Sequence, residues 1–409
     1  MAKVLVVGGG AAGMMAAYAA GSTGHEVTLL EKNEKLGKKI YITGKGRCNF
    51  TNCCDTEDFF KNVVSNPKFL YSALYTFSSD MVVDFIESHG TPTKVERGNR
   101  AFPESDHASD ITKAFASALK EVGVKVMLHS EVTKLISESE SITGVELKDG
   151  TKISCEHLII CTGGLSYKTT GSTGDGIKFA KKLGLKTVET RPALVPMNCK
   201  EDYVTLMQGL SLKNVELTIF DGNKKLYSEF GEMLFTHFGV SGPLVLSASS
   251  VVGKRLMEKG SLKAFIDLKP ALSKDVLEER LLREFKDNQN KKLVTVIKGL
   301  VPSSMVEILT QVSELDSEKQ INSVTREERE RIINALKTFP FTITGLRDYN
   351  EAIVTAGGVS VKEIDPSTMM AKNIKGLSFA GEVLDVDAFT GGFNLQIAFS
   401  TGYLAGISI

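Results

Sequence analysis

The chain has 409 residues, 42% of them hydrophobic and 24% charged, which is the composition of a globular protein and excludes a disordered chain. A chain of this length is too long to fold around a single hydrophobic core of ordinary size. We therefore expect a large cofactor domain and at least one further domain. Lys+Arg and Asp+Glu both total 49, so no net charge attracts nucleic acid or an anionic membrane, although a local basic patch stays open.

The N-terminus superficially resembles a signal peptide, because Lys3 is followed by an uncharged run from Val4 to Ser22. That run is rich in Gly and Ala, and its glycines are placed for a strand, a tight turn and a helix. No other stretch is long and apolar enough to span a bilayer, and without an export signal the six cysteines should be reduced thiols. We therefore expect a cytoplasmic protein without membrane association.

A dinucleotide-binding fingerprint follows the first predicted strand, Lys3 to Val7. Residues 8 to 13 read Gly-Gly-Gly-Ala-Ala-Gly and open an Ala-rich helical stretch from Met14 to Ala20. In such a loop the first glycine makes the turn, the second lets backbone approach a pyrophosphate, and the third lets the helix pack on the strand. The helix N-terminus stabilises the phosphate charge. The predicted cofactor residues here are Gly8, Gly10, Ala11, Ala12 and Gly13.

A second predicted strand, Glu26 to Leu30, ends at an acidic residue. Glu31 lies 31 − 13 = 18 residues beyond the last glycine, where a carboxylate that binds the adenosine ribose is expected. An acid at this position disfavours a ribose phosphate and leaves NAD or FAD. Glu31 and the adjacent Lys32 are therefore predicted to contact the cofactor.

Three later segments favour FAD over NAD. Residues 38 to 52 form a Gly-rich loop that a plain NAD dehydrogenase does not need, and its Arg47 can bind pyrophosphate or the flavin edge, although a basic turn is also a common surface feature. The apolar run Leu158 to Cys161 leads into Thr162 and Gly163, consistent with backbone close to a ring system or with a simple strand end.

The third segment is at the C-terminus. A predicted strand, Gly376 to Ala380, ends at Gly381 and Glu382, whose carboxylate can accept hydrogen bonds from ribityl hydroxyls. A final helix from about Asn394 to Ala405 would point its N-terminus at the flavin and stabilise the negative charge of the reduced ring, unless it serves only for packing.

These segments resemble the BaiN/aminoacetone oxidase-like family of bacterial FAD-dependent flavoproteins over nearly the whole chain. The resemblance rests on residues 8–13 with Glu31, and on 44–52, 166–176, 234–243, 379–385 and 390–396. Two departures bear on the substrate: Lys168 stands where the family usually has proline, and Met370-Ala371 where it usually has Glu-Ser.

The resemblance implies an α/β fold with a Rossmann-like FAD domain of the glutathione-reductase type, residues 1–190 and 345–409. The inserted domain, 191–344, would have a β-barrel part (191–268) and a helical part (269–340). In agreement, Glu216 to Phe220 reads as a strand before an Asp221-Gly222-Asn223 turn, and Ser273 and Ser303 are placed to cap helices.

The resemblance also implies cofactor contacts. They fall on the adenosine end, the loop after the second strand, a strand Lys125 to Leu135, and the flavin end. The residues are Gly10, Ala12, Glu31, Arg47, Cys48, Asn49, Val132, Glu382, Asp385, Asn394 and Leu395.

Four alternatives stay open. Cys48 and Cys53 have the C-x4-C spacing of a flavin disulfide reductase, but neither a second GxGxxG nor a C-terminal His-Pro is present. An RNA-modifying flavoprotein is disfavoured by the balanced charge and by the lack of an aromatic–basic cluster in the sequence. The third alternative is a non-catalytic protein module that binds FAD. The fourth is an oxidase that acts on a small amine such as aminoacetone.

The expected activity is therefore hydride transfer through flavin N5 to a small-molecule substrate. The resemblance favours NAD(P)H-linked reduction of an enone such as a 3-oxo-Δ4,6 bile-acid intermediate, with NAD(P)H docking transiently. His237 and Tyr167 are candidate proton donors, although a structural role is favoured for both. No catalytic residue is assigned, no metal site is expected from the Cys, His and carboxylate spacing, and the oligomeric state stays open.

Overall fold

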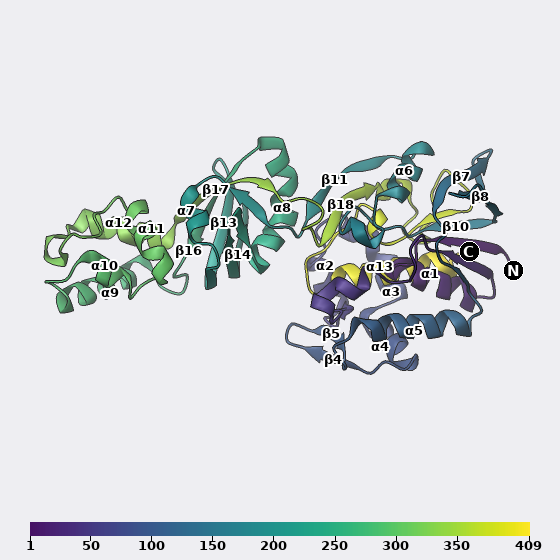
Figure 1. The fold of residues 1–409 in the computed structure, drawn as a ribbon, viewed down its shortest axis with the longest axis horizontal. Helices are drawn as coiled ribbons and strands as arrows, with labels where there is room; N and C mark the ends of the chain where they lie inside the picture. The colour runs from purple at the N-terminus through teal and green to yellow at the C-terminus, as the bar shows by residue number, and fades with distance from the viewer. The chain divides into compact units, whose positions relative to one another are not determined.

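The computed structural model describes residues 1–409, which divide into two compact units (Figure 1). One unit comprises Met1–Ala193 and Tyr349–Ile409, and the other comprises Leu194–Asp348. The boundaries predicted from the sequence, 190/191 and 344/345, lie three and four residues before these.

The first unit is built on a five-stranded parallel sheet. Its order is β19 (Leu377–Phe379), β10 (His157–Ile160), β1 (Lys3–Val7), β2 (Glu26–Leu30) and β6 (Lys125–Met127). Strands of this kind are covered on both faces and are therefore almost continuously apolar, which is why β1 and β2 could be placed correctly from sequence. The Rossmann-like α/β fold is confirmed.

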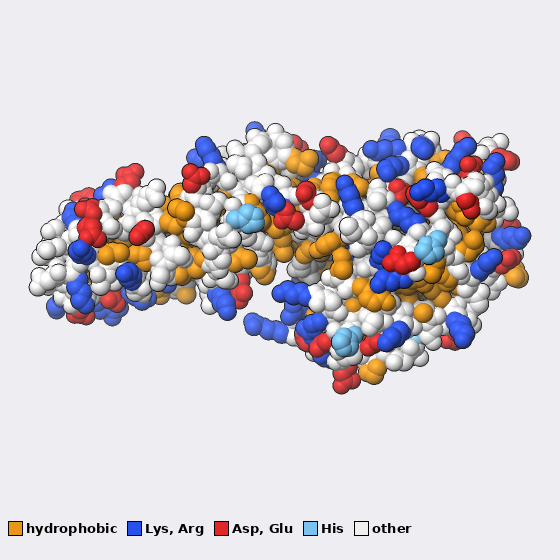
Figure 2. All heavy atoms as spheres, in the orientation of Figure 1, with side chains coloured by type: hydrophobic (Ala, Val, Ile, Leu, Met, Phe, Trp, Pro, Cys, Tyr) orange, Lys and Arg blue, Asp and Glu red, His pale blue; other side chains and the backbone are white.

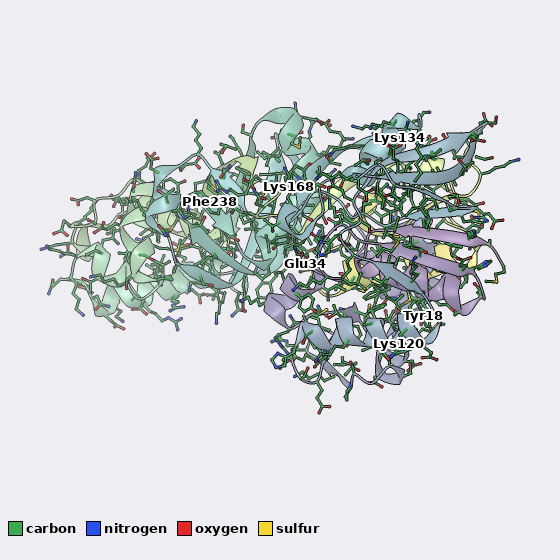
Figure 3. The ribbon with its side chains drawn as sticks, turned by 45° about the vertical axis from the view of Figure 1, so that its right-hand side comes forward. Tyr18, Glu34, Lys120, Lys134, Lys168 and Phe238 are labelled. Atoms are coloured by element: carbon green, nitrogen blue, oxygen red, sulfur yellow. The ribbon has the colours of Figure 1, made fainter.

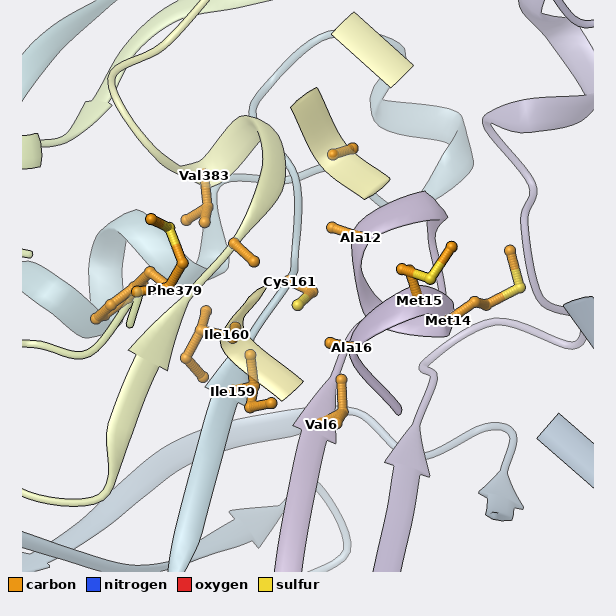
Figure 4. Close-up of a cluster of buried hydrophobic side chains, with 14 of the residues drawn as sticks. Val6, Ala12, Met14, Met15, Ala16, Ile159, Ile160, Cys161, Phe379 and Val383 are labelled. Atoms are coloured by element: carbon orange, nitrogen blue, oxygen red, sulfur yellow. The ribbon is translucent and has the colours of Figure 1, made fainter. Parts of the chain in front are cut away.

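The two ends of the chain pack against one another in this unit. Helix α13 (Phe393–Ile407) lies against α1 (Ala11–Ser22), and small residues set the spacing. A Cβ on Gly402 would lie 2.4 Å from the Ala12 carbonyl oxygen, and one on Gly406 would lie 2.5 Å from that of Ala16. Figure 4 shows side chains of α1, β1, β10 and β19 meeting in the same buried cluster.

The predicted strand from Lys125 to Leu135 is wrong as a single element. The chain leaves the parallel sheet after β6 and starts a new strand, β7 (Val132–Glu138), in a separate antiparallel sheet with β8 (Ser141–Leu147) and β9 (Lys152–Ser154). His129 at the break has a φ of 54° and donates its N–H to the Asn33 carbonyl. This tertiary contact ends the strand, and local sequence does not show it.

The remaining elements of the first unit surround this frame. A small antiparallel sheet has the order β3-β5-β4, and β11 pairs with β18. These elements are β3 (Thr51–Asn52), β4 (Thr93–Glu96), β5 (Arg100–Pro103), β11 (Thr187–Ala193), β18 (Val354–Val359), α2 (Thr56–Lys61), α3 (Tyr71–Thr76), α4 (Ser79–Ser88), α5 (Ala108–Glu121) and α6 (Asp175–Lys182).

The second unit is a closed six-stranded barrel with a helical insertion between its last two strands. The barrel order is β12 (Met197–Cys199), β15 (Gly239–Ser241), β14 (Lys224–Thr236), β13 (Ser211–Asp221), β16 (Leu262–Asp267) and β17 (Phe339–Leu346). Its helices are α7 (Asp202–Leu206), α8 (Pro243–Lys259), α9 (Lys274–Asp287), α10 (Leu293–Ile297), α11 (Val306–Val312) and α12 (Arg326–Lys337). The predicted barrel with a helical region is confirmed, but the predicted barrel part, 191–268, omits β17, which closes the barrel after the helices.

In this unit the predicted turn and one of the two predicted helix caps agree with the structure, and the other cap does not. Asp221 pairs with Lys224, so the predicted hairpin turn is confirmed, and the Ser273 hydroxyl accepts from the Val276 N–H to cap α9. Ser303 is not a cap: it lies inside a 3₁₀ turn that leads into α11. No helix in either unit combines the length and the apolar character that crossing a bilayer requires.

Candidate cofactor site

The loop between β1 and α1 has one glycine that faces open space. A Cβ on Gly8 would lie 2.5 Å from the Cys161 oxygen, and one on Gly13 would lie 1.8 Å from the Gly8 oxygen, so both glycines are needed for packing. A Cβ on Gly10 would meet nothing within 4 Å, and no side chain caps α1 there. The N–H groups of the first helical turn thus have no side-chain cap, and the space beside Gly10 is open, as the binding of a diphosphate there requires.

Glu31 is held at the end of β2 by this loop. It is 7% exposed, and its Oε2 accepts from the Gly9 N–H at 2.7 Å, while Oε1 accepts from the backbone and side-chain nitrogens of Asn33. A carboxylate so fixed has lone pairs left for the hydroxyls of a ribose. Lys32 instead points to Asp175 Oδ2 (2.8 Å) and Thr173 Oγ1 (2.7 Å), so its cofactor contact stays a prediction.

The loop after β2 contains one unpartnered acceptor. Asn49 Oδ1 is buried and has no hydrogen-bond partner, as expected for an atom that meets a ligand donor. Arg47, by contrast, has protein partners: it contacts Glu96 and Asp106, which raise its pKa, and its guanidinium lies 4.2 Å from the centre of the Phe102 ring. Its predicted contact with the cofactor is not tested by this geometry.

The end of β10 turns sharply beside α6. Thr162 Oγ1 accepts from the Gly176 N–H at 3.0 Å, and Gly163 has a φ of 70°. The Thr162 side chain is thus used to join β10 to α6, and only the backbone of these two residues is left for a ring system. Val132, the other predicted contact on this side, opens β7 and is 8% exposed.

Glu382 lies at the centre of a network that the sequence did not reveal. Its Oε2 accepts from Lys39 Nζ at 2.6 Å, and its Oε1 accepts from Ser166 Oγ (2.8 Å) and the Thr355 N–H (2.9 Å). Lys39 Nζ also donates to Ser166 Oγ at 2.5 Å. Lys39, Ser166 and Thr355 come from segments that are distant in sequence. They are identified as site residues only because the structure places them next to Glu382, which the sequence predicts as a cofactor contact.

Apart from Glu382, the segment from 381 to 395 presents backbone rather than side chains. Gly381 has a φ of 78° and a Cβ there would lie 2.7 Å from the Ala12 Cβ. The Asn394 side chain is used locally, with Nδ2 donating to the carbonyls of Ala388 and Phe389 and Oδ1 accepting from the Ala388 N–H. Asp385 accepts from Asn66 Nδ2 at 3.0 Å. The uncapped N–H groups of α13, including those of Asn394 and Leu395, are what this end can offer to a flavin.

Asp387 is a buried carboxyl between the two ends of this segment. It is 0% exposed, neither side-chain oxygen has a hydrogen-bond partner, and burial raises its pKa to about 6. Ser65 and Arg191 lower this pKa in part, whereas Asp385 and Glu382 raise it. A carboxyl in this environment is held in its neutral form more strongly than in the unfolded chain.

Asp387→Asn is therefore expected to change how stability depends on pH. A folded pKa above the unfolded value near 4 means that wild type is stabilised at low pH and loses this contribution as pH rises through about 6. At about 1.4 kcal/mol per pKa unit, the variant should gain about 2–3 kcal/mol relative to wild type between pH 4 and pH 8. Urea unfolding of both proteins across this range measures the difference, and a constant difference would contradict the assignment.

The thiols and the two candidate proton donors show no redox or acid–base constellation. Burial raises the pKa of Cys48 to about 12 and raises that of Cys53, which disfavours the thiolate that disulfide exchange requires. His237 is exposed in the β14–β15 turn, with its ring edge-on to Phe238. Tyr167 has a φ of 54° and donates its N–H to the Tyr349 carbonyl. The next residue, Lys168 (labelled in Figure 3), has its Nζ 5.9 Å from the centre of the Tyr349 ring. No group of three or more His, Cys, Asp or Glu side chains is placed to hold a metal ion.

A family model for the HI0933-like protein Rossmann domain matches residues 2–408. The chain belongs to the HI0933-like family. Members of this family are FAD-dependent oxidoreductases, and so is this protein. The open space at Gly10, the fixed Glu31 and the unpartnered Asn49 oxygen fit FAD.

Three curated relatives of this HI0933-like protein align over nearly its whole length. Ribosomal RNA dihydrouridine synthase of Haemophilus influenzae is 31% identical over 99% of this chain and 98% of its own. The protein of the same name from Escherichia coli is 33% identical over 98% and 96%. The 3-dehydro-bile acid Δ(4,6)-reductase of Clostridium scindens is 30% identical over 99% and 98%.

Solved structures agree on the fold of the HI0933-like protein. The 3-ketosteroid-Δ4-(5α)-dehydrogenase of Rhodococcus jostii RHA1, in complex with 4-androstene-3,17-dione, superimposes with a TM-score of 0.54 over 100% of this chain and 96% of its own, at 15% identity. The 3-ketosteroid Δ1-dehydrogenase of Sterolibacterium denitrificans gives 0.53 over 99% and 98%, at 14% identity. At such identities the likeness concerns the fold alone.

Proposed function

We propose that the protein reduces a carbon–carbon double bond conjugated to a carbonyl group, with FAD as resident cofactor and NAD(P)H as transient electron donor. One observation supports this proposal above the others: the three full-length relatives are named for the same bond change. A 3-dehydro bile acid with Δ4,6 unsaturation has its double bonds conjugated to the 3-oxo group. Dihydrouridine is uridine whose C5–C6 double bond, conjugated to the C4 carbonyl, has been saturated.

The reaction balances with one hydride, which is two electrons and a proton, and one further proton from outside the substrate. Bound FAD would supply the electrons as a hydride from N5 of its reduced ring, to the carbon β to the carbonyl. The proton goes to the α-carbon, and NAD(P)H is oxidised to NAD(P)⁺ in the reductive half. The protein's own residues bind and orient the cofactor and the substrate, and they stabilise charge.

Different residues of the chain are assigned to these tasks. The Gly10 backbone and the α1 N–H groups would hold the diphosphate, and Glu31 the adenosine ribose. Lys39, fixed by Glu382 at 2.6 Å, places a cation beside the loop that leads to α13. The uncapped α13 N-terminus carries partial positive charge, which would favour negative charge on the reduced ring of a flavin bound there.

The first candidate substrate is a small enone such as a 3-oxo-Δ4,6 bile-acid intermediate, which the name of the Clostridium scindens relative supports. A second candidate is a uracil base in RNA, because two of the three relatives carry the dihydrouridine synthase name. Both molecules present the same conjugated carbonyl, so the bond change alone does not choose between them.

The test is anaerobic and uses the purified yellow protein. NADH or NADPH is expected to bleach the flavin, and addition of a 3-oxo-Δ4,6 steroid acid, or of ribosomal RNA lacking dihydrouridine, should restore the colour and yield a product carrying two added hydrogens. A substrate that gains no hydrogen while only a small amine bleaches the protein, with peroxide formed in air, would instead support the amine-oxidase alternative and overturn this proposal.

A further inference from the structure

One lysine of the first unit is held by two hydrogen bonds among the predicted cofactor residues. Lys39 Nζ donates to Glu382 Oε2 at 2.6 Å and to Ser166 Oγ at 2.5 Å, and its side chain is 22% exposed. An ammonium group has three N–H donors, so one of them remains. The Glu382 side chain is 20% exposed; its Oε1 accepts from Ser166 and from the Thr355 N–H, and its Oε2 keeps a lone pair. The network therefore leaves one donor and one acceptor for a ligand.

This network lies where strands of the parallel sheet end. Lys39 is in the loop after β2, Ser166 is in the loop after β10, and Glu382 is in the turn after β19. A Cβ on Gly164, also after β10, would lie 3.1 Å from Glu382 Oε1, so the backbone there approaches the carboxylate closely. Open α/β sheets bind their ligands at the carboxyl ends of the strands, which is the edge that carries these three side chains.

The N-terminal halves of two helices pack against the turn that carries Glu382. This turn, Gly381–Val383, contacts both α1 and α13. A Cβ on Gly381 would lie 2.7 Å from the Ala12 Cβ of α1 and 3.8 Å from the Ala398 Cβ of α13. Neither helix has a side-chain cap at its N-terminus, so both carry partial positive charge there. The network around Glu382 therefore lies beside both helices that are assigned to FAD.

The charges on the surface largely cancel one another. Lys+Arg and Asp+Glu both total 49, and Figure 2 shows the two signs interspersed over the face in view. Exposed charges are screened by salt, whereas partly buried charges are screened much less. Charged groups close to a flavin ring tune its reduction potential. A partly buried pair such as Lys39 and Glu382 is therefore expected to act on the ring more strongly than the exposed charges do.

We propose that Lys39 raises the reduction potential of the bound flavin by compensating the charge of the Glu382 carboxylate. Glu382 is predicted to accept hydrogen bonds from the ribityl hydroxyls, but reduction adds negative charge to the ring, which an uncompensated carboxylate nearby would oppose. With Lys39 fixed on it, Glu382 can bind the hydroxyls without opposing reduction. The inference rests on the proposed function for the resident FAD alone, because a potential is measured without NAD(P)H and without substrate.

The experiment measures the midpoint potential of the FAD-loaded wild type and of Lys39→Met, Lys39→Arg and Glu382→Gln, by anaerobic reduction against a reference dye. Lys39→Met should shift the ratio of reduced to oxidised flavin at a fixed potential about tenfold toward the oxidised form, which is about 30 mV for a two-electron couple. Glu382→Gln leaves the ammonium group uncompensated and should shift the ratio in the opposite direction. Lys39→Arg keeps the positive charge and should stay close to wild type.

Matched controls come from an ion pair of the other unit. Lys319 Nζ and Glu328 Oε1 are also 2.6 Å apart, and their side chains are 28% and 15% exposed. Lys319→Met and Glu328→Gln should therefore leave the potential unchanged. Ser166→Ala is a control within the site, because it removes hydrogen bonds to both charged groups but no charge. It should shift the potential less than Lys39→Met does.

Shifts of the same sign in Lys39→Met and Glu382→Gln, or a wild-type potential in Lys39→Met, would overturn the inference. For a variant that holds FAD weakly, titration with oxidised and with reduced FAD gives the same quantity, because the ratio of the two affinities sets the shift in potential. Equal losses of both affinities in Lys39→Met would show that Lys39 only helps to hold the cofactor, and would also overturn the inference.

The two proposals fail separately in this experiment. A wild-type protein that holds FAD and can be reduced, but saturates no conjugated double bond, loses the proposed function, while the opposite shifts of the two variants still support the role of Lys39. A wild-type protein that saturates such a bond, with a potential that Lys39→Met does not change, keeps the proposed function and loses this inference.

Discussion

Gly10→Val is expected to give a folded protein without bound FAD. The position has a φ of −85° and a ψ of −168°, which any residue adopts, and a Cβ there meets no atom of the protein within 4 Å. The added isopropyl group therefore costs the fold little but fills the space in which backbone N–H groups would meet the diphosphate. Cofactor retention should fall by at least two orders of magnitude, as expected when about 3 kcal/mol of binding energy is lost.

The measurement is the ratio of flavin to protein absorbance after purification, followed by titration with added FAD. Gly345→Val is the matched control, because that glycine lies in β17 of the other unit and its nearest neighbour to an added Cβ, Asn198 Nδ2, is 3.6 Å away. The control should stay fully yellow. A yellow Gly10→Val protein would show that the diphosphate does not lie against this turn.

Gly402→Val is expected to unfold the first unit. Its Cβ would lie 2.4 Å from the Ala12 oxygen and 3.1 Å from the Ala12 carbonyl carbon, both backbone atoms that cannot rotate away. Relief requires α13 to move off α1, which would also pull the Gly381 N–H from Thr401 Oγ1, to which it donates at 3.0 Å. We expect a loss of about 3 kcal/mol or more, against a gain of less than about 1 kcal/mol from better helix propensity.

Thermal and urea unfolding of Gly402→Val, with Gly345→Val beside it, measures this effect. Because the proposed cofactor site uses α1 from one end of the chain and α13 from the other, FAD should be lost together with stability. Wild-type stability for Gly402→Val would mean that the two helices are not packed through this glycine.

The sequence alone was sufficient to predict those elements whose position depends on their own residues. The strands β1 and β2 are short, apolar and bounded by Gly or charged residues, so their predicted bounds agree with the structure. The glycines at 8, 10 and 13 likewise gave the strand, turn and helix in order, because each has a separate steric reason. The two-part FAD domain came from the family resemblance and not from periodicity.

Tertiary contacts explain what the sequence did not show. The break before β7 depends on His129 and Ser130 bonding to the Asn33 and Glu31 carbonyls. Lys39, Ser166 and Thr355 lie far from Glu382 in sequence, and no spacing rule connects them to it. Asn394 is predicted to contact the flavin, but its side-chain amide hydrogen-bonds to the turn before α13. The composition of the segment does not show this hydrogen bond.

The central claim is that FAD held between the two ends of the chain saturates a double bond conjugated to a carbonyl. Its most direct test is to bleach the protein with NADPH without oxygen, remove excess donor, and add either a 3-oxo-Δ4,6 steroid acid or uridine-containing ribosomal RNA. We expect one of them to restore the flavin colour and to gain two hydrogens per flavin. A protein that stays bleached with both and regains colour only with oxygen would contradict it.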